Sequence, residues 1–382
     1  MGSEMCIRDR SKSGDINLTP LGLGGMGFGG YFTKNLKNNS EQVRLIEEAY
    51  DLGVNVIDTA EIYGQGASEE TIGKTSKNVR NNLFIMSKFS PQNSRPNDIF
   101  KSIDASLKRT KRDFLDVYQP HWPQPGIRLE DTLETLEKLK TLGKIRFSGL
   151  SNFTAQQIDS VDLEKYNSLR FFSVERNPIE HNLANDLTPI IDSLDGVLVS
   201  YSPFREGQIF KSTKFDDLIR FSKSLGFTPS QVLLAWGMAN GKTIVIPKVS
   251  SSKHLRENIE SMKISLSDSA IDYISDLFKP QIIKILPKDI IPDISVKEDE
   301  RAIYKNLEEA KNNVYNFHPG PKDIANEIQE NQGLLYKPIK VREINKDGKY
   351  VLIDGRLRFW AWIILNGWHK PIDSMIINSI KV

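Results

Sequence analysis

Short runs of aliphatic and β-branched residues alternate with helical patterns from Ile16 to about Phe278, and this alternation limits the fold more than any other feature of the chain. Eight of the runs are candidate strands, and longer stretches with apolar residues at helical spacing separate them. In chain order the runs are PLGLGGM, VNVIDTA, LFIMSKF, LDVYQPHW, IRFSGLS, FFSVERN, GVLVSYS and TIVIPKV. Eight strands that alternate with helices over roughly 260 residues predict an α/β fold, a (β/α)8 TIM barrel.

Signals at helix ends support this alternation. Ser40 and Thr228 are expected to be N-caps, and Gly53 and Gly143 stand just after helix ends, where glycine is favoured. A doubly wound sheet would alternate in the same way, but its first strand needs a GxGxxG turn that leads directly into a helix. The glycine-rich run GLGGMGFGG is not followed promptly by a helical pattern. We therefore expect a barrel rather than a doubly wound sheet.

Composition excludes several classes of protein. The chain has 382 residues, of which 39% are hydrophobic and 26% are charged, and its formal net charge is +2. These values are typical of a globular protein and provide no general argument for binding to DNA or to an anionic membrane. No apolar run approaches the ~18–20 residues of a membrane span. The single cysteine, Cys6, excludes an internal disulfide framework, and we expect a cytoplasmic protein.

The first residues do not resemble the start of a barrel. Glu4–Arg10 (EMCIRDR) resembles the translation of a transposon end used to prepare sequencing libraries. An amphipathic or basic targeting segment is the other interpretation, but the stretch has no apolar face to support it. We therefore expect residues 1–14 to be an artefactual or disordered N-terminus, and the barrel to occupy residues 15–278.

The pattern changes after the barrel. A proline-punctuated, extended stretch, KPQIIKILPKDIIPDIS, marks a boundary near residues 279–285. The elements expected beyond it are helices at about 298–313, 321–330 and 357–366 and strands at YKPIKVREI, KYVLIDG and IDSMIINSI. About 100 residues are enough for one small α+β domain, which we assign to residues 279–382.

Polar side chains stand at the carboxyl ends of successive predicted strands, where barrel enzymes hold their reactive groups. Asp58 ends VNVID and Tyr63 follows it in the next loop, while Lys88 ends LFIMSK and His121 ends VYQPH. Each residue alone has an ordinary structural interpretation, such as a loop tyrosine, a strand-end charge or a turn cap. Their order on successive strand ends favours a catalytic group.

Three segments, GVNVIDTAEIYGQGASEETIGK, YQPHWP and GLSNF, resemble the aldo-keto reductase family and occur in the family's order. The resemblance covers about residues 15–278 and implies NAD(P)H-dependent reduction of an aldehyde or ketone, or the reverse alcohol oxidation, by hydride transfer. Tyr63 would be the general acid, and Lys88 would lower the pKa of its hydroxyl. Asp58 would hold Lys88, and His121 would hydrogen-bond the carbonyl oxygen.

The same resemblance implies a cofactor site. IPKVSSSKHLRENI resembles the family's phosphate-binding segment, a strand end that leads into a helix N-terminus. The candidate contacts within it are Lys248, Ser250, Ser251, Arg256 and Asn258, although a solvated helix start is the structural alternative. Lys248 and Arg256 favour NADPH through attraction to a 2′-phosphate. His254 stands where the family often has arginine, so NADH is the other possibility. No metal is expected.

The nicotinamide half of the cofactor has its own matches. Ser151 and Asn152 match the family's pair that holds the nicotinamide amide, and Tyr201 matches the tyrosine that stacks under the ring. A small-molecule carbonyl compound is therefore the expected partner of the barrel.

Two positions depart from the family pattern. The glutamine that usually provides a further amide contact appears as Ser173, and a commonly aromatic position appears as Arg176. Arg176 and Glu175 add charge near the expected mouth of the barrel and suggest a sugar-type or anionic substrate. The alternative is that Arg176 forms a surface ion pair.

The C-terminal segment LLYKPIKVREINKDGKYVLIDGRLRFWAWIILNGW resembles the N-terminal domain of the ParB family, which shares its fold with sulfiredoxin. Gly355, Arg358 and Ala361 form its Gly-x-x-Arg-x-x-Ala helix start, which in ParB proteins binds the phosphates of a cytidine nucleotide. The resemblance implies a nucleotide or phosphate contact at Gly355, Arg356 and Arg358. The structural alternative is that the aromatic residues of this helix only form its core face.

Departures from the ParB pattern narrow this expectation. An acidic residue and an arginine usually follow the glycine, whereas this chain has Arg356 and Leu357. No cysteine stands in the turn and no helix-turn-helix pattern follows, so thiol chemistry and specific DNA binding are not expected. Residues 280–382 contain 16 Lys+Arg and 14 Asp+Glu, which does not favour DNA either. A second hypothesis makes the barrel a cofactor sensor coupled to this nucleotide-binding module, with a regulatory role.

Overall fold

The protein divides into two compact units. The computed structural model describes residues 7–9, 16–159, 161–279, 281–292, 304–315, 319–331, 333–335, 338–344 and 348–376. One unit comprises Met1–Ile209 and Asp216–Leu277, and the other comprises Phe210–Phe215 and Phe278–Val382. Each unit is described by itself below.

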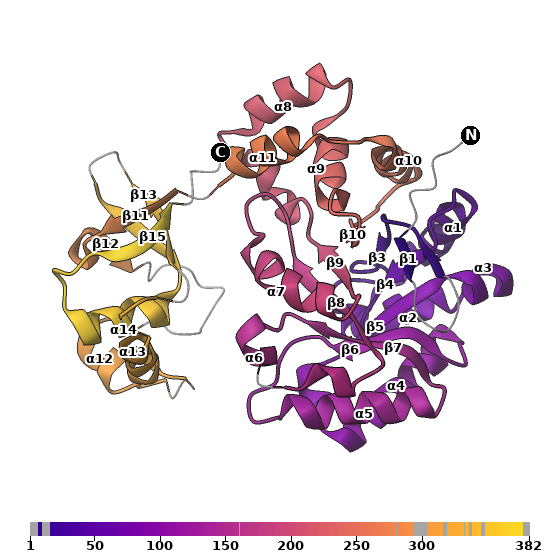
Figure 1. Cartoon of the computed structure of the whole chain (residues 1–382), viewed down its shortest axis with the longest axis horizontal. Coiled ribbons are helices and arrows are strands. Elements are labelled where there is room, and N and C mark those ends of the chain that lie inside the picture. The colour runs from indigo at the N-terminus through magenta and orange to yellow at the C-terminus, as the bar shows by residue number, and fades with distance from the viewer. Residues whose placement is uncertain are drawn as a thin grey trace. The chain divides into compact units, whose positions relative to one another are not determined.

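Eight parallel strands form the sheet of the first unit (Figure 1). They are β3 (Leu23–Gly24), β4 (Val56–Asp58), β5 (Phe84–Phe89), β6 (Leu115–Pro120), β7 (Ile145–Ser151), β8 (Leu169–Glu175), β9 (Val197–Tyr201) and β10 (Thr243–Ile246). Neighbours in the sheet are neighbours in the chain, from β3 to β10. Parallel bridges from Leu21 to Val245 and from Gly24 to Lys248 join the first strand to the last. The predicted eight-stranded parallel barrel is therefore confirmed.

Helices surround this sheet, as Figure 1 shows. The α-helices are α1 (Asn39–Asp51), α2 (Ala67–Ile72), α3 (Lys77–Asn82), α4 (Pro96–Thr110), α5 (Leu129–Thr141), α6 (Ala155–Asp159), α7 (Asn182–Ser193), α8 (Phe215–Ser224), α9 (Pro229–Met238), α10 (Ser252–Glu260) and α11 (Asp268–Leu277). Short 3-10 helices are η1 (Tyr63–Gly66), η2 (Pro91–Asn93), η3 (Leu163–Lys165), η4 (Arg205–Lys211) and η5 (Ser261–Lys263), while η6 (Pro287–Asp289) belongs to the second unit. None of the helices in the described ranges is both long and apolar enough to span a membrane.

The expected helix ends are mostly confirmed. Thr228 caps α9 through a reciprocal capping box with Gln231, and Gly53 and Gly143 follow helix ends with φ of +93° and +70°. Ser40 is not the N-cap of α1, because the helix begins one residue earlier at Asn39.

A strand at the N-terminus is the only part of residues 1–14 within the described ranges. β1 (Ile7–Asp9) pairs antiparallel with β2 (Ile16–Leu18). The expectation that the rest of this segment is artefactual or disordered falls on residues outside the described ranges.

The inside of the barrel is apolar at one end and polar at the other. Side chains on one face of a strand recur every second residue, and the inward-facing residues deepest in the barrel include Val56, Phe84, Phe147 and Phe171, all nearly fully buried. The three phenylalanine rings pack at centroid distances of 5.5–6.5 Å. This packing fills the lower barrel, so only side chains beyond it, at the carboxyl ends of the strands, can contact a ligand.

The second unit contains a mixed five-stranded sheet, in the order β11-β15-β13-β14-β12. Its elements are β11 (Gln281–Ile285), β12 (Ile290–Pro292), α12 (Leu307–Lys311), α13 (Pro321–Glu330), β13 (Ile339–Glu343), β14 (Tyr350–Asp354), α14 (Arg356–Asn366) and β15 (Ile372–Ile376). The helices cover one face of the sheet (Figure 1). The helix expected at 298–313 is shorter, and residues 293–303 lie outside the described ranges.

Aromatic residues of α14 form much of the core of this unit. Phe359, Trp360 and Trp362 are at most 6% exposed, as is the aliphatic Ile363 beside them, and all four pack with the buried residues of the sheet. The aromatic residues of α14 therefore form a core face, which is the part of the structural alternative that burial can test.

Candidate active site

The four predicted catalytic residues meet at the carboxyl ends of the barrel strands, which we call the mouth of the barrel. Asp58, Lys88 and His121 continue the inward-facing positions of β4, β5 and β6, beyond Val56, Met86 and Val117. Tyr63 begins η1 in the loop after β4. Strand alternation thus brings together side chains that are far apart in the chain.

Lys88 and Asp58 form a buried ion pair. The Lys88 Nζ lies 2.5 Å and 2.6 Å from the two carboxylate oxygens of Asp58, and it also donates to the Thr59 carbonyl at 3.1 Å. The two side chains are only 3% and 4% exposed. Burial raises the pKa of Asp58, and the charge of Lys88 opposes that rise. The ammonium is held by three acceptors and has one fixed position.

Tyr63 lies between Lys88 and His121. Its Oη is 3.5 Å from the His121 Nε2, and the Lys88 Nζ lies 5.7 Å from the centre of its ring. Burial raises the pKa of Tyr63 well above 10, with further contributions from Asp58 and Tyr201. The pKa of Tyr63 is therefore raised rather than lowered, which differs from the expectation, because burial of the hydroxyl has the largest effect and the charge of Asp58 adds to it. Tyr63 carries its proton at neutral pH, as a proton donor must.

His121 is a neutral imidazole. Burial, followed by repulsion from Lys88, lowers its pKa to about 2. Its ring stacks on Trp122 with a centroid distance of 3.9 Å and an interplanar angle of 7°, and its backbone carbonyl accepts a hydrogen bond from Asn152 at 3.0 Å. A neutral imidazole in a fixed position can donate a hydrogen bond to a ligand at the mouth, or accept one from it, without gaining or losing charge.

Asn152 and Tyr201 form a pair beside the tetrad. The Tyr201 Oη donates to the Asn152 Oδ1 at 2.5 Å, and the Asn152 Nδ2 donates to the Ser151 Oγ at 3.1 Å. Asn152 has a φ of +65°, which turns its side chain out of the strand line. Ser151 is 0% exposed, so in this conformation it acts on a ligand only through Asn152.

Ser173 is also inaccessible from the mouth. It is 0% exposed, and its Oγ accepts a hydrogen bond at 2.9 Å from the Nε2 of Gln119, which is itself fully buried. Sequence reasoning did not single out Gln119, although it stands two residues before His121 on the same strand face. The next inward-facing residue of β8, Glu175, is partly exposed and lies opposite Tyr201.

Arg176 faces away from the mouth, which contradicts its suggested role near the substrate. Its Nη1 donates to the Gly237 carbonyl at 2.8 Å, and its guanidinium lies 4.3 Å from the centre of the Trp236 ring. Burial lowers the pKa of Arg176 to about 10. Strand alternation explains this position, because Arg176 follows the inward-facing Glu175 and points to the helix layer. Its partners there are the carboxyl end of α9 and an indole.

The predicted phosphate-binding segment connects β10 to α10. Ser251 caps α10 by accepting from the His254 N–H at 3.2 Å, and the Ser250 hydroxyl lies 3.2 Å from the His254 Nδ1. Lys248 contacts the Tyr31 hydroxyl and lies 4.5 Å from the centre of that ring. A capped helix start with an exposed lysine before it is a suitable place for an anion.

Two of the predicted phosphate contacts are not fully available to a ligand in this conformation, because Arg256 is paired and Asn258 is buried. Arg256 donates to the Glu48 carboxylate of α1 at 2.6 Å, and Ser252 donates to the same oxygen at 2.6 Å. Asn258 is only 6% exposed. A phosphate that used Arg256 would therefore compete with Glu48.

The sequence profile of the Aldo/keto reductase family matches residues 20–279. The chain belongs to this family. Methylglyoxal reductase YeaE from Escherichia coli (strain K12) is 27% identical over 267 residues, which cover 68% of this chain and 90% of the relative. Among solved structures, the thermostable aldo-keto reductase Tm1743 is 34% identical, with a TM-score of 0.64 over 70% of this chain and 97% of that chain. An aldo-keto reductase from Klebsiella pneumoniae, solved in complex with NADPH, is 27% identical, with a TM-score of 0.63 over 69% and 93% of the two chains.

Membership of the aldo/keto reductase family defines the chemistry of the barrel. The protein is an oxidoreductase that reduces carbonyl compounds with NAD(P)H. The alternative, in which the barrel only senses its cofactor, is not favoured. The family match ends at residue 279, and the ParB/sulfiredoxin-like resemblance of the second unit is still a prediction.

The predicted anion site of the second unit contains its own carboxylate. Gly355 precedes α14 with a φ of +88°, and its N–H donates to the Asp354 Oδ1 at 2.7 Å. The other oxygen of Asp354 lies 4.0 Å from the Arg358 Nη2 and 3.5 Å from the Lys340 Nζ. The Asp354 carboxylate therefore holds the place that a phosphate would need. Arg356 begins α14 and is partly buried.

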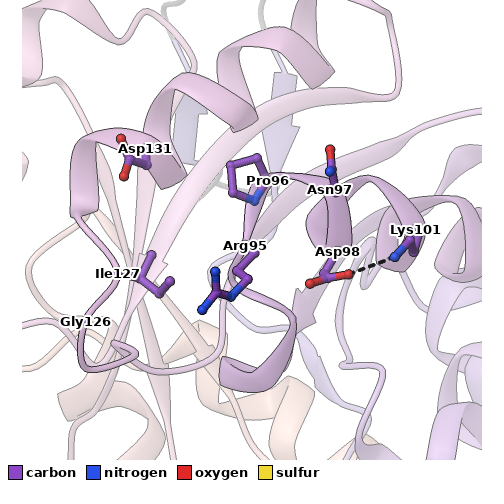
Figure 2. Close-up of a pocket in the computed structure, with 8 residues that line it drawn as sticks. All are labelled: Arg95, Pro96, Asn97, Asp98, Lys101, Gly126, Ile127 and Asp131. Carbon is purple, nitrogen blue, oxygen red and sulfur yellow. Dashed lines mark hydrogen bonds and ion pairs between the residues drawn. The ribbon is translucent and has the colours of Figure 1, made fainter.

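A separate hollow lies where α4 and α5 begin (Figure 2). It has a volume of about 530 Å³, and Asp98 and Lys101 form an ion pair of 3.0 Å at its edge. It is lined by Arg95, Pro96, Asn97, Asp98, Lys101, Gly126, Ile127 and Asp131, none of which is a predicted site residue. Across the described residues, no group of three or more His, Cys, Asp or Glu side chains could hold a metal ion.

Proposed function

We propose that Tyr63 is the general acid of this reductase and that it protonates the carbonyl oxygen of a small aldehyde or ketone. NADPH, when bound, supplies the hydride. The raised pKa of Tyr63 keeps its hydroxyl protonated, and Lys88 lies close enough to its ring to stabilise the tyrosinate as the proton leaves. Asp58 positions Lys88, and the neutral His121 orients the carbonyl oxygen.

The residues at the mouth are suitable for a nicotinamide cofactor. Among the described residues, the buried His121 Nδ1 has no hydrogen-bond partner, and such an atom in a native protein is a candidate contact for a ligand or a water molecule. Tyr201 offers a ring face, and Asn152 offers an amide to the carboxamide. We assign direct contacts to these two residues, and positioning roles to Ser151 and Ser173.

NADPH is the preferred cofactor in this proposal. The N-terminus of α10, with Lys248, Ser250 and Ser251, would hold the phosphates, and Arg256 would leave Glu48 to bind the 2′-phosphate. Asn258 would contribute through the packing of α10. The Klebsiella pneumoniae relative that was solved with NADPH supports this choice.

The proposed substrate is a small aldehyde rather than a sugar derivative. The relatives include a methylglyoxal reductase and a glyoxal reductase. Because Arg176 points into the helix layer, it cannot select an anionic substrate. Trp122, 42% exposed and stacked on His121, gives the mouth an apolar wall.

The position of Tyr63 between Lys88 and His121 carries the proposal. The test is methylglyoxal-dependent oxidation of NADPH by wild type and by Tyr63→Phe, which removes only the hydroxyl. We expect at least about a hundredfold loss of kcat, because general acid catalysis contributes on the order of 10²–10⁴-fold. Tyr273→Phe makes the same change on an exposed ring of α11 and should turn over like wild type. Equal turnover by Tyr63→Phe and wild type would refute the proposal.

For the second unit we propose a ParB/sulfiredoxin-like domain with a weak phosphate contact at Gly355, Arg356 and Arg358. The positive φ of Gly355 at the start of α14 is the observation in its favour. Titration of cytidine triphosphate against the full chain tests it, with Arg358→Ala for comparison. We expect the wild type to bind cytidine triphosphate saturably. We expect Asp354→Asn to bind it more tightly, because the Asp354 carboxylate competes with the phosphate. Binding that Arg358→Ala leaves unchanged would contradict the assignment.

A further inference from the structure

On β8, one inward-facing residue reaches the mouth of the barrel. The inward-facing positions of this strand are Phe171, Ser173 and Glu175, by the alternation that Phe171 establishes in the barrel core. Phe171 and Ser173 are both 0% exposed, whereas Glu175 is partly exposed. A cofactor that enters the mouth therefore meets a carboxylate on this strand.

Glu175 is held next to the predicted nicotinamide contacts. It is the sheet partner of Tyr201 on β9, and the Tyr201 Oη in turn donates to Asn152. The Nδ2 of the fully buried Asn177 donates to the Glu175 Oε1 at 3.1 Å and to the Ser202 carbonyl at 3.2 Å. This hydrogen bond fixes one oxygen of the Glu175 carboxylate in position. Burial, followed by the charge of Glu175, raises the pKa of Tyr201 to about 12, which is consistent with a carboxylate close to that ring.

We propose that Glu175 places a negative charge beside the nicotinamide ring and makes this enzyme hold oxidised cofactor more tightly than reduced cofactor. The inference rests on the proposed function, since it requires the ring to lie over Tyr201. An oxidised nicotinamide carries a positive charge that a reduced one lacks. In a site that excludes water, a nearby carboxylate stabilises the charged form selectively.

The negative charge of Glu175 affects two steps: the transfer of the hydride from the cofactor and the release of the oxidised cofactor. With NADPH bound, transfer of a hydride to the carbonyl carbon would leave a positive charge on the nicotinamide; Glu175 would stabilise that charge while Tyr63 would deliver the proton to oxygen. Afterwards Glu175 holds the oxidised cofactor and slows its release. A neutral side chain at this position would do neither.

The experiment measures the dissociation constants of NADP⁺ and NADPH for the full chain by quenching of protein fluorescence. Glu175→Gln keeps the size and the acceptor oxygen but removes the charge. We expect the ratio Kd(NADPH)/Kd(NADP⁺) to fall about tenfold in Glu175→Gln. Glu175→Asp keeps the charge and should retain most of the wild-type ratio. Glu134→Gln, on an exposed position of α5, removes the same charge far from the mouth and should leave the ratio unchanged.

The outcomes separate this inference from the proposed function. If wild type binds both cofactors saturably and Glu175→Gln has the same ratio, the inference is wrong and the proposed function stands. If wild type binds neither cofactor, both are wrong. If Glu134→Gln changes the ratio Kd(NADPH)/Kd(NADP⁺) as much as Glu175→Gln does, the inference is also wrong, because the change would then reflect only the net charge of the protein.

Discussion

Asp58 and Lys88 should depend on each other for stability, and their coupling can be measured. Their side chains are 3% and 4% exposed and joined by contacts of 2.5 Å and 2.6 Å. Removing one partner leaves the other as an unpaired buried charge, which typically costs about 3–5 kcal/mol. We therefore expect Asp58→Asn and Lys88→Met each to lower the free energy of unfolding by about 3 kcal/mol or more.

The double variant provides the decisive comparison. Asp58→Asn combined with Lys88→Met buries no charge, so it should recover at least about 2 kcal/mol relative to the sum of the single effects. The free energies come from urea unfolding followed by circular dichroism. All three variants should lose NADPH-dependent reductase activity, because each removes the fixed ammonium beside Tyr63.

A surface pair offers a matched control for this cycle. Lys34 and Glu70 lie 2.6 Å apart but are 41% and 32% exposed, and such pairs contribute about 0–1 kcal/mol. The cycle of Lys34→Met and Glu70→Gln should therefore show little coupling. Strictly additive effects at Asp58 and Lys88, equal to those of the surface pair, would refute the argument that burial makes this pair interdependent.

Three other outcomes follow from the structure. The pKa of His121 is lowered to about 2, below the ordinary 6.5, so the unfolded chain binds a proton between these values that the folded protein does not. Wild type should therefore lose about 2 kcal/mol of stability between pH 8 and pH 5 that His121→Gln does not lose, as urea unfolding at the two values would reveal; parallel losses would contradict it. Arg176→Met removes the contacts with Trp236 and Gly237, and should cost about 1–2 kcal/mol of stability while leaving the KM for NADPH and aldehyde unchanged, which steady-state kinetics checks. A raised KM for the aldehyde in Arg176→Met would contradict the placement of Arg176 away from the substrate. Trp360→Ala opens a cavity in the core of the second unit and should lower its stability by about 3–5 kcal/mol, measured by thermal unfolding, whereas Trp122→Ala at an exposed position should cost much less.

Local signals in the sequence were sufficient for the barrel and for the positions of its polar strand ends. Eight apolar runs with helices between them have few other stable arrangements, and the capping residue Thr228 and the glycines Gly53 and Gly143 act through short-range geometry. The placement of Asp58 and Lys88 on one inner face also follows from the two-residue period of a strand. These features depend on neighbours in the chain, so they are readable without a structure.

The protonation of Tyr63 and the accessibility of Ser173 could not be predicted from the sequence. Lys88 next to a tyrosine suggested a lowered pKa for Tyr63, but the balance depends on how much water surrounds the hydroxyl and on the charge of Asp58. Ser173 seemed suited to a cofactor contact, yet Gln119 and complete burial remove it from the mouth. Both quantities are sums over residues that are distant in the chain.

Glu175 and Arg176 illustrate the division most clearly. The sequence alone determined that two adjacent, oppositely charged residues end a strand and must therefore face opposite sides of the sheet. Only the tertiary structure decided that the acid faces the mouth and the base faces the helix layer. The physical reason is that the apolar core in the lower barrel, with Phe171 inward, sets which face of β8 is the inside.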